Sequence, residues 1–193
     1  MSRAFDANRR DGIIVRTARA SDAQEIAELD VRSWRAAYSD IFPASELEKL
    51  SVDERRSCWK RIIARNFGSQ LAVVGELDGE IVGFCQAGPD RSRMEDAAEI
   101  YTLYVDPEHW GEGVGTALLD VVLPWLAPNY DTATLWVVRE NALARRFYEA
   151  RGFRWVEHSF KAFSFFDYLA QCVRYSKRLD AHFSYDWRQM YGA

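Results

Sequence analysis

Three glycines alternate with other residues directly after a predicted strand. Gly111, Gly113 and Gly115 follow the strand-like run 98–105, and a helical pattern begins at Val114. Glycine lets a backbone pass close to a ligand, and the first turn of a helix carries amide N–H groups that have no intrahelical partner. Together with the helix dipole, these groups favour a phosphate. The loop therefore predicts a phosphate site, although a glycine-rich turn without a ligand would have the same pattern.

Two other phosphate-binding loops do not fit this spacing. A dinucleotide fingerprint, G-x-G-x-x-G, would need its third glycine at Thr116 if it began at Gly111, or at Leu118 if it began at Gly113. A nucleoside triphosphate loop needs a Gly-Lys pair, and the sequence contains none. Dinucleotide binding and nucleoside triphosphate hydrolysis are therefore disfavoured.

Hydrophobic periodicity predicts the elements that must position the loop. Asp78-Gly79 fits a two-residue type I′ turn, so the strands around it should form an antiparallel hairpin. A hairpin combined with strand–helix–strand units predicts an α/β (α+β) fold, with helices packed on a mixed sheet. Helices are expected at 21–38, at 52–64, from 114 onward and at 141–151; Pro124 should kink or end the third, and Gly152 should stop the fourth as a left-handed cap. Strands are expected at 13–16, 70–77, 80–87, 98–105, 132–138, 153–158 and 169–178, the last two joined by an aromatic loop.

Length and composition indicate a single cytoplasmic domain. The chain has 193 residues, of which 48% are hydrophobic, enough for one substantial core. It contains no apolar run of about 18 residues and no apolar stretch of a secretory signal, so no membrane partner is expected. We expect a flexible N-terminus at 1–12, the domain at 13–179 and an aromatic C-terminal tail at 180–193.

Charge and cysteine usage exclude further classes. A net charge of -4 argues against a nucleic-acid partner, because binding to phosphate backbones needs a basic face. The three cysteines form no C-x-x-C pair, and the three histidines lack the spacing of metal ligands, so neither a disulfide framework nor a metal site is predicted.

Two motifs resemble those of the GNAT superfamily of N-acetyltransferases. The segment 110–115, Trp-Gly-Glu-Gly-Val-Gly, resembles the acetyl-CoA loop [QR]-x-x-G-x-[GA] of that family. The segment 141–153 resembles its second motif, N-x-x-A-x-x-[FL]-Y-x-x-x-G-F. The motifs come in the family's order, and the resemblance extends over residues 13–178. One departure is Trp110, which replaces the usual Gln or Arg, so any help from that side chain to the pyrophosphate is lost.

The resemblance implies a fold and a co-substrate. The fold is a mixed, mostly antiparallel central sheet of about seven strands, with flanking helices and a splayed central strand pair. Acetyl-CoA would lie in the splay, with its pantetheine arm on the backbone of Leu103 and Val105 and its pyrophosphate on the glycine loop. Asn141 would contact the cofactor, and it would serve equally as an ordinary helix N-cap. The implied cofactor-binding residues are Leu103, Tyr104, Val105, Trp110, Gly111, Glu112, Gly113, Val114, Gly115, Thr116 and Asn141.

Acyl transfer to an amine also needs catalytic groups. The amine must be uncharged, the departing thiolate needs a proton, and the developing oxyanion needs a donor. By resemblance, Tyr148 gives the proton and a backbone N–H near Val105 polarises the oxyanion; the alternative for Tyr148 is a tyrosine packed on the sheet. Glu99, at the start of the strand before the loop, is the candidate general base through a water, or else a solvated strand-end residue.

The resemblance also locates the acceptor, a primary amine on a small molecule or peptide. Trp34, Tyr38 and Tyr101 are candidates for its site, because aromatic faces attract ammonium groups, but helical spacing favours a core position for Trp34. The family and the aromatic tail are compatible with a homodimer. Two alternatives remain. One is a non-catalytic module that binds or senses acyl-CoA. The other is an interaction or toxin–antitoxin component acting on a macromolecule such as aminoacyl-tRNA, which the acidic charge disfavours.

Overall fold

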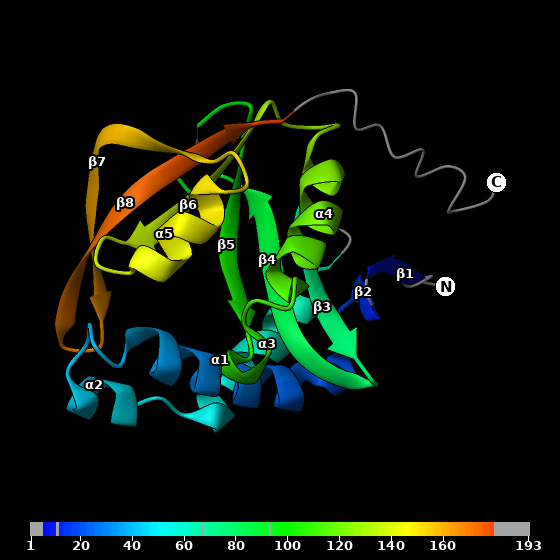
Figure 1. Ribbon diagram of the computed structural model, residues 1–193, viewed down its shortest axis with the longest axis horizontal. Helices are drawn as coiled ribbons and strands as arrows, with labels where there is room; N and C mark the ends of the chain where they lie inside the picture. The colour runs from blue at the N-terminus through cyan, green and yellow to red at the C-terminus, as the bar shows by residue number, and fades with distance from the viewer. Residues whose placement is uncertain (1–5, 11, 67, 93, 180–193) are drawn as a thin grey trace.

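The computed structural model describes residues 6–10, 12–66, 68–92 and 94–179. These residues form one eight-stranded sheet with the strand order β1-β2-β3-β4-β5-β6-β8-β7 (Figure 1). Neighbouring strands are antiparallel except β5 and β6, which are parallel, so the predicted mixed, mostly antiparallel sheet is confirmed. The strands are β1 (Asp6–Arg10), β2 (Ile13–Thr17), β3 (Leu71–Leu77), β4 (Glu80–Pro89), β5 (Ala97–Val105), β6 (Thr132–Val138), β7 (Arg154–Phe165) and β8 (Tyr168–Arg178).

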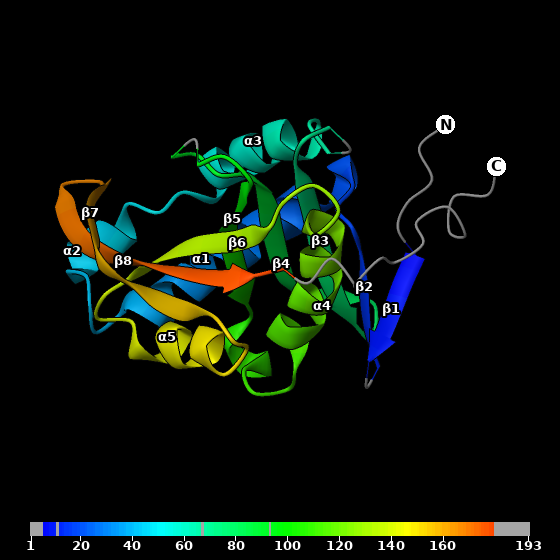
Figure 2. The same ribbon diagram turned by 90° about the horizontal axis from the view of Figure 1, so that it is seen from above.

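Helices cover both faces of the sheet. Figure 2 shows α3 and α5 on opposite sides of the strands. On one face, Leu118 and Tyr148 join the main core; on the other, Ile26 and Trp59 pack against Phe84 of β4. Among the described residues, no helix is both long and apolar enough to cross a membrane. The helices are α1 (Ala23–Tyr38), α2 (Ala44–Glu48), α3 (Val52–Ile63), α4 (Val114–Leu126) and α5 (Ala142–Glu149), with 3₁₀ turns at Ala20–Asp22 and Pro107–His109.

Local sequence signals account for the main turns. Asp78 and Gly79 have φ angles of 52° and 90°, which are the two left-handed residues of the predicted type I′ hairpin. Gly152 follows α5 with a φ of 81°, which is the predicted left-handed cap. Pro124, expected to kink or end its helix, lies inside α4, which continues to Leu126.

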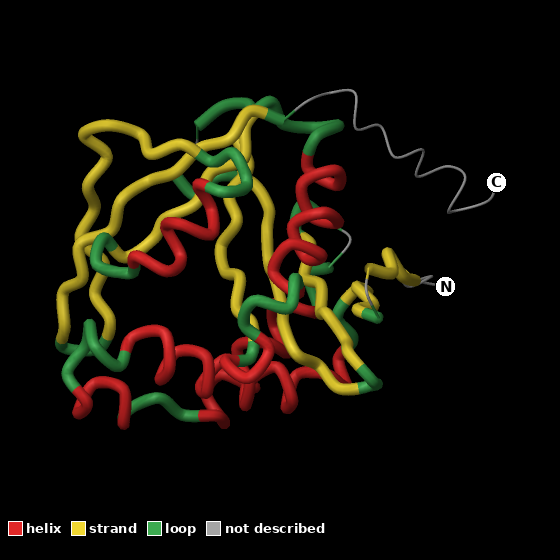
Figure 3. Tube along the Cα trace, viewed as in Figure 1, coloured by secondary structure: helices red, strands yellow, loops and turns green. Residues whose placement is uncertain are grey.

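The central strands separate where the phosphate-binding loop begins. β4 pairs with β5 along its length, from Pro89 opposite Ala98 to Gly83 opposite Val105. β6 pairs with β5 only as far as Ile100, and its remaining residues pair with β8. Figure 3 shows the two strands diverging toward the end of the sheet near α1. Residues 101–105 of β5 therefore have a strand on one side only, and the predicted splayed pair is confirmed.

Three elements differ from the sequence prediction. The expected aromatic loop between the last two strands is mostly strand, because β7 continues to Phe165 and turns at residues 166–167. Its aromatic residues Phe163 and Phe165 pack against the cluster that contains Trp34. α2 follows Pro43, where only a break was expected. β1 lies in the segment expected to be flexible; its pairing with β2 uses backbone groups, so an irregular polar sequence gives no signal for it. The predicted aromatic tail at 180–193 lies outside the described residues.

Candidate active site

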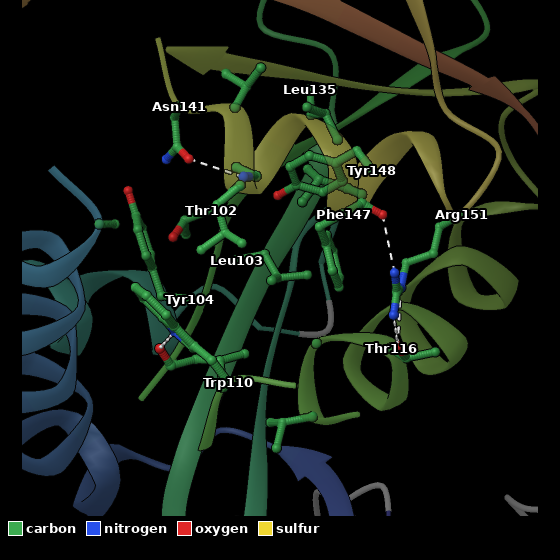
Figure 4. Close-up of a pocket in the computed structure, with 18 of the residues that line it drawn as sticks. Thr102, Leu103, Tyr104, Trp110, Thr116, Leu135, Asn141, Phe147, Tyr148 and Arg151 are labelled. Carbon is green, nitrogen blue, oxygen red and sulfur yellow. Dashed lines mark hydrogen bonds between the residues drawn. The ribbon is translucent and has the colours of Figure 1, made fainter. Parts of the chain in front are cut away.

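A pocket of about 290 Å³ opens where β5 and β6 diverge (Figure 4). Its walls are residues of β5 and β6, the loop and first turn of α4, the inner face of α5 and the C-terminal end of α1. Three predicted site residues, Trp34, Glu99 and Glu112, are not part of its wall. The structure brings together there the predicted residues Tyr38, Tyr101, Leu103, Tyr104, Val105, Trp110, Gly111, Gly113, Val114, Gly115, Thr116, Asn141 and Tyr148.

The glycine loop has the geometry of an anion site. Gly111 and Gly113 have φ angles of 86° and 89°, a region that other residues rarely adopt. Gly113 is the N-cap of α4, and its carbonyl accepts the first helical hydrogen bond, from Ala117 N at 2.9 Å. The intervening amides of Val114, Gly115 and Thr116 therefore have no acceptor within the helix, and these three residues line the pocket at a helix N-terminus, where an anion is favoured.

The Trp110 side chain forms a hydrogen bond with the strand that precedes the loop. Its indole Nε1 donates a hydrogen bond to the Val105 carbonyl at 2.9 Å, although 42% of the residue is exposed. The same carbonyl accepts a second bond from Ser33 Oγ at 3.2 Å. The Val105 carbonyl, one of the backbone groups assigned to the pantetheine arm, thus already has two protein donors.

Tyr148 and Asn141 line the opposite wall, on α5. Tyr148 is buried, its hydroxyl is directed into the pocket (Figure 4), and no described residue forms a hydrogen bond with it. Burial raises the pKa of Tyr148 above its usual value, so the hydroxyl keeps its proton at any working pH. The Asn141 side chain accepts a hydrogen bond from Ala144 N at 3.0 Å, which confirms the N-cap, and it also borders the pocket.

Two tyrosines close the side of the pocket toward α1. The hydroxyls of Tyr38 and Tyr104 lie 3.2 Å apart, and burial raises the pKa of both residues. Trp34 packs behind them with its ring centroid 4.8 Å from that of Tyr38 and is buried. Trp34 is therefore a core residue, the position that its helical spacing favoured.

Glu99 is an ion-pair partner rather than a solvated residue. It is 1% exposed, and its carboxylate accepts hydrogen bonds from Arg91 N at 3.0 Å, from Arg91 Nε at 3.1 Å and from Arg91 Nη2. The alternative of a solvated strand end is wrong, because the turn after β4 folds Arg91 back over the strand. Among the described residues that line the pocket there is no Asp or Glu, so a carboxylate base would have to act from outside the wall.

The aromatic rings at the far end of the pocket already have cations on them. The Arg91 guanidinium lies 4.8 Å from the centroid of Tyr101, and Arg174 and Lys161 lie 5.6 and 5.8 Å from that of Trp136. The Tyr101 hydroxyl donates to the Pro89 carbonyl at 2.6 Å, and burial raises the pKa of Tyr101 to about 12. Of the aromatic faces expected to attract a substrate ammonium, that of Tyr101 therefore contacts one of the protein's own cations.

Sequence reasoning missed several wall residues on α5 and just after it. Ala144, Phe147 and Arg151 line the pocket beside the predicted Tyr148, and their spacing of three, four and seven residues puts all four on one face. Once Tyr148 is placed in the site, this helical spacing predicts the other three wall residues from the sequence. The guanidinium of Arg151 contacts Thr116 on the facing helix, at the glycine-loop end of the pocket (Figure 4).

No group of three or more potential metal ligands occurs in the described part of the chain.

Comparison with known proteins identifies the family. Residues 23–153 match the acetyltransferase (GNAT) family, a stretch that contains the glycine loop and Tyr148. The chain belongs to this family. An uncharacterized N-acetyltransferase of Bacillus subtilis, YuaI, is 31% identical over 131 residues, which cover 67% of this chain and 73% of the relative. A mycothiol acetyltransferase of Acidimicrobium ferrooxidans is 34% identical over 72% of this chain, but that match covers only 42% of the relative.

Solved GNAT structures share the fold. The PaiA N-acetyltransferase of Thermoplasma acidophilum in complex with coenzyme A superposes with a TM-score of 0.68 at 22% identity, over 84% of this chain and 97% of that one. A putative acetyltransferase, yncA, of Salmonella typhimurium with acetyl-CoA gives 0.66 at 20% identity, over 89% of this chain and 96% of that one. These likenesses show that the fold is shared, and the family match makes the chain an acetyltransferase by family.

Proposed function

We propose that this protein transfers the acetyl group of acetyl-CoA to a primary amine by direct attack within a ternary complex. One observation carries the proposal: a single pocket joins the helix-capping glycine loop at one end to the protonated hydroxyl of Tyr148 at the other. The loop supplies backbone donors for the pyrophosphate, and Tyr148 supplies a proton near the place where the thioester would lie.

The chain's own groups account for most of the chemistry. The acceptor nitrogen forms a bond to the acetyl carbon as the carbon–sulfur bond breaks, the thiolate receives a proton from Tyr148, and the nitrogen releases one of its own protons to water. Because burial raises the pKa of Tyr148, its phenolate is a strong base, and the hydroxyl is regained by taking up a proton from water. The unpaired edge of β5 at 101–105 offers backbone groups to the pantetheine arm and the acetyl oxygen.

The charge around the far end of the pocket bears on the acceptor. Arg91 and Arg174 beside these rings are ion-paired with Glu99 and Asp90, and Lys161 adds a positive charge; because the described wall has no acidic side chain to hold an ammonium, this end favours the neutral form of an acceptor amine. The amine therefore reacts as its neutral form without a carboxylate base in direct contact.

Other features fit a small-molecule enzyme of the cytoplasm. The mycothiol acetyltransferase relatives are named for a small-molecule reaction, which supports a small acceptor over a macromolecule. Cys58, Cys85 and Cys172 are all free thiols, as in a reducing compartment. A homodimer stays a prediction, which light scattering of the purified protein tests.

Thermal stability with and without acetyl-CoA, followed by thiol release with a panel of amines, tests the proposal. A ligand that binds only the folded state must raise the melting temperature with its concentration. We expect Tyr148→Phe to keep the acetyl-CoA shift and to lower turnover by about 10²-fold or more, because only proton donation is removed. A wild-type protein that shows no shift with millimolar acetyl-CoA would contradict the proposal.

The alternative is a module that binds acyl-CoA without transferring it. The ion pair between Glu99 and Arg91 favours this alternative, because the carboxylate predicted to be the general base is already bonded to an arginine. Turnover decides between the two: an acetyl-CoA-dependent melting shift without thiol release for any amine of the panel would support the binding module.

A further inference from the structure

The pocket wall carries one permanently charged side chain among the described residues, Arg151. His109 is the other ionisable group there besides tyrosine. A CoA thioester carries its negative charge on phosphates, so a cation in the wall indicates where they would lie.

Arg151 reaches the glycine loop from the second residue after α5. Its Nε donates a hydrogen bond to Thr116 Oγ1 at 3.0 Å, and its Nη2 donates to the same oxygen. Its Nη1 donates to the Phe147 carbonyl at 3.1 Å, and the guanidinium lies 3.9 Å from the centroid of the Phe147 ring. These contacts fix a planar, half-buried cation against the first turn of α4.

The neighbourhood matches the needs of a diphosphate. Thr116 belongs to the turn whose amides have no helical acceptor, so backbone donors, a hydroxyl and a guanidinium converge on one end of the pocket (Figure 4). A guanidinium can bind two phosphate oxygens at once, and a half-buried position reduces its screening by salt.

Because Trp110 carries no charge, the glycine loop depends on another residue, Arg151, for a positive charge. In the GNAT acetyl-CoA loop the first position is usually Gln or Arg, whereas the indole of Trp110 is bonded to Val105 and carries no charge. We propose that Arg151 binds the diphosphate of CoA together with the first turn of α4, and that α5 thereby supplies the charge that the loop itself lacks. The inference rests on the proposed acetyl-CoA site and adds one residue to it.

A purely structural role is the competing explanation, since Arg151 also bridges α4 and α5. Arg151→Gln and Arg151→Lys separate the two, with Arg146→Gln as a matched control; Arg146 is an exposed arginine of α5 outside the pocket wall. The probes are CoA, 3′-dephospho-CoA and pantetheine, which carry all the phosphates, the diphosphate alone and none, respectively.

We expect Arg151→Gln to weaken binding of CoA and dephospho-CoA equally, by about ten- to a hundredfold in Kd, and Arg151→Lys to restore part of the loss. The loss of CoA affinity in Arg151→Gln should shrink in molar salt, because salt screens the charge–phosphate attraction. The melting-temperature shift that millimolar pantetheine causes should be the same in Arg151→Gln as in the wild type. Arg146→Gln should bind all three probes as the wild type does. An equal loss for pantetheine, or unchanged CoA binding, would overturn the inference in favour of a structural role. A loss for CoA alone would move the contact to the 3′-phosphate. A wild type that binds none of the probes would instead contradict the acetyl-CoA site itself.

Discussion

The hydroxyls of Tyr38 and Tyr104 lie 3.2 Å apart and join α1 to β5 at the side of the pocket. Either hydroxyl can be the donor, and the high pKa of both keeps both protons in place. The pair therefore links the first helix to the splayed strand, which limits the width of the pocket on the side toward α1.

Removing one hydroxyl should leave the other without its partner. We expect Tyr38→Phe and Tyr104→Phe each to lower the free energy of unfolding by about 0.5–1.5 kcal/mol, and the double variant to cost less than the sum of the two. Urea unfolding of the four proteins measures this coupling. Tyr148→Phe is the control, because no described residue bonds its hydroxyl, and its stability should be close to that of the wild type. Strictly additive losses would show that the two hydroxyls do not interact.

Glu99 should matter more for stability than for turnover. Its carboxylate is buried against Arg91, whose side chain is 58% exposed, so Glu99→Gln leaves an arginine that water can solvate. Loss of these charge-assisted hydrogen bonds should lower the free energy of unfolding by about 1–3 kcal/mol. With an amine that the enzyme accepts, the pH dependence of kcat/KM should keep its wild-type shape. If Glu99→Gln instead slowed turnover by about 10²-fold or more at unchanged stability, Glu99 would be the general base.

Asp30 should destabilise the folded protein when it ionises. Burial raises the pKa of Asp30, and the opposing effects of Arg55 and Trp59 are smaller. A folded-state pKa above the unfolded value of 3.8 means that stability is lost as pH rises through the folded pKa. Asn keeps an oxygen for the hydrogen bond from Trp59 Nε1, which is 3.0 Å long. We therefore expect Asp30→Asn to be at least as stable as the wild type at pH 7, with the difference vanishing below about pH 4.

Asp22 is a control for Asp30, because its pKa is shifted in the opposite direction. Burial raises its pKa, but hydrogen bonds from Arg16 and from Arg19 N more than compensate, so the pKa of Asp22 lies below its usual value. The stability that this ion pair contributes is present above the unfolded pKa and is lost as pH falls through the folded one. Asp22→Asn should therefore be less stable than the wild type at pH 7, as measured by urea unfolding. Equal responses of the two variants would show that burial and pairing do not determine these two pKa values.

Local signals made most of the fold and half of the site predictable. Asp78-Gly79, the glycine loop and the helical spacing of Tyr148 depend on neighbours within a few residues, and the structure has them where the sequence indicated. The ion pair of Glu99 with Arg91 depends on how the chain folds back between β4 and β5, which no local pattern encodes. β7 is longer than expected because its aromatic residues find partners on α1 and α2, far away in sequence.

Two glycines of the loop should be sensitive to substitution for different physical reasons. At Gly111 an added Cβ would meet no atom within 4 Å, but the φ angle of 86° strains any other residue. At Gly115 an added Cβ would lie 2.9 Å from Phe147 Cζ, so the space between α4 and α5 is the constraint.

We expect Gly111→Ala to cost about 1–2 kcal/mol of unfolding free energy and Gly115→Ala about 1–3 kcal/mol, for these different reasons. A second change, Phe147→Leu, should recover part of the loss in Gly115→Ala by making room, and it should do nothing for Gly111→Ala. Urea unfolding of the single and double variants measures both effects. If Phe147→Leu rescued Gly111→Ala as well, the two glycines would share one steric constraint, and the left-handed conformation of Gly111 would not explain its cost.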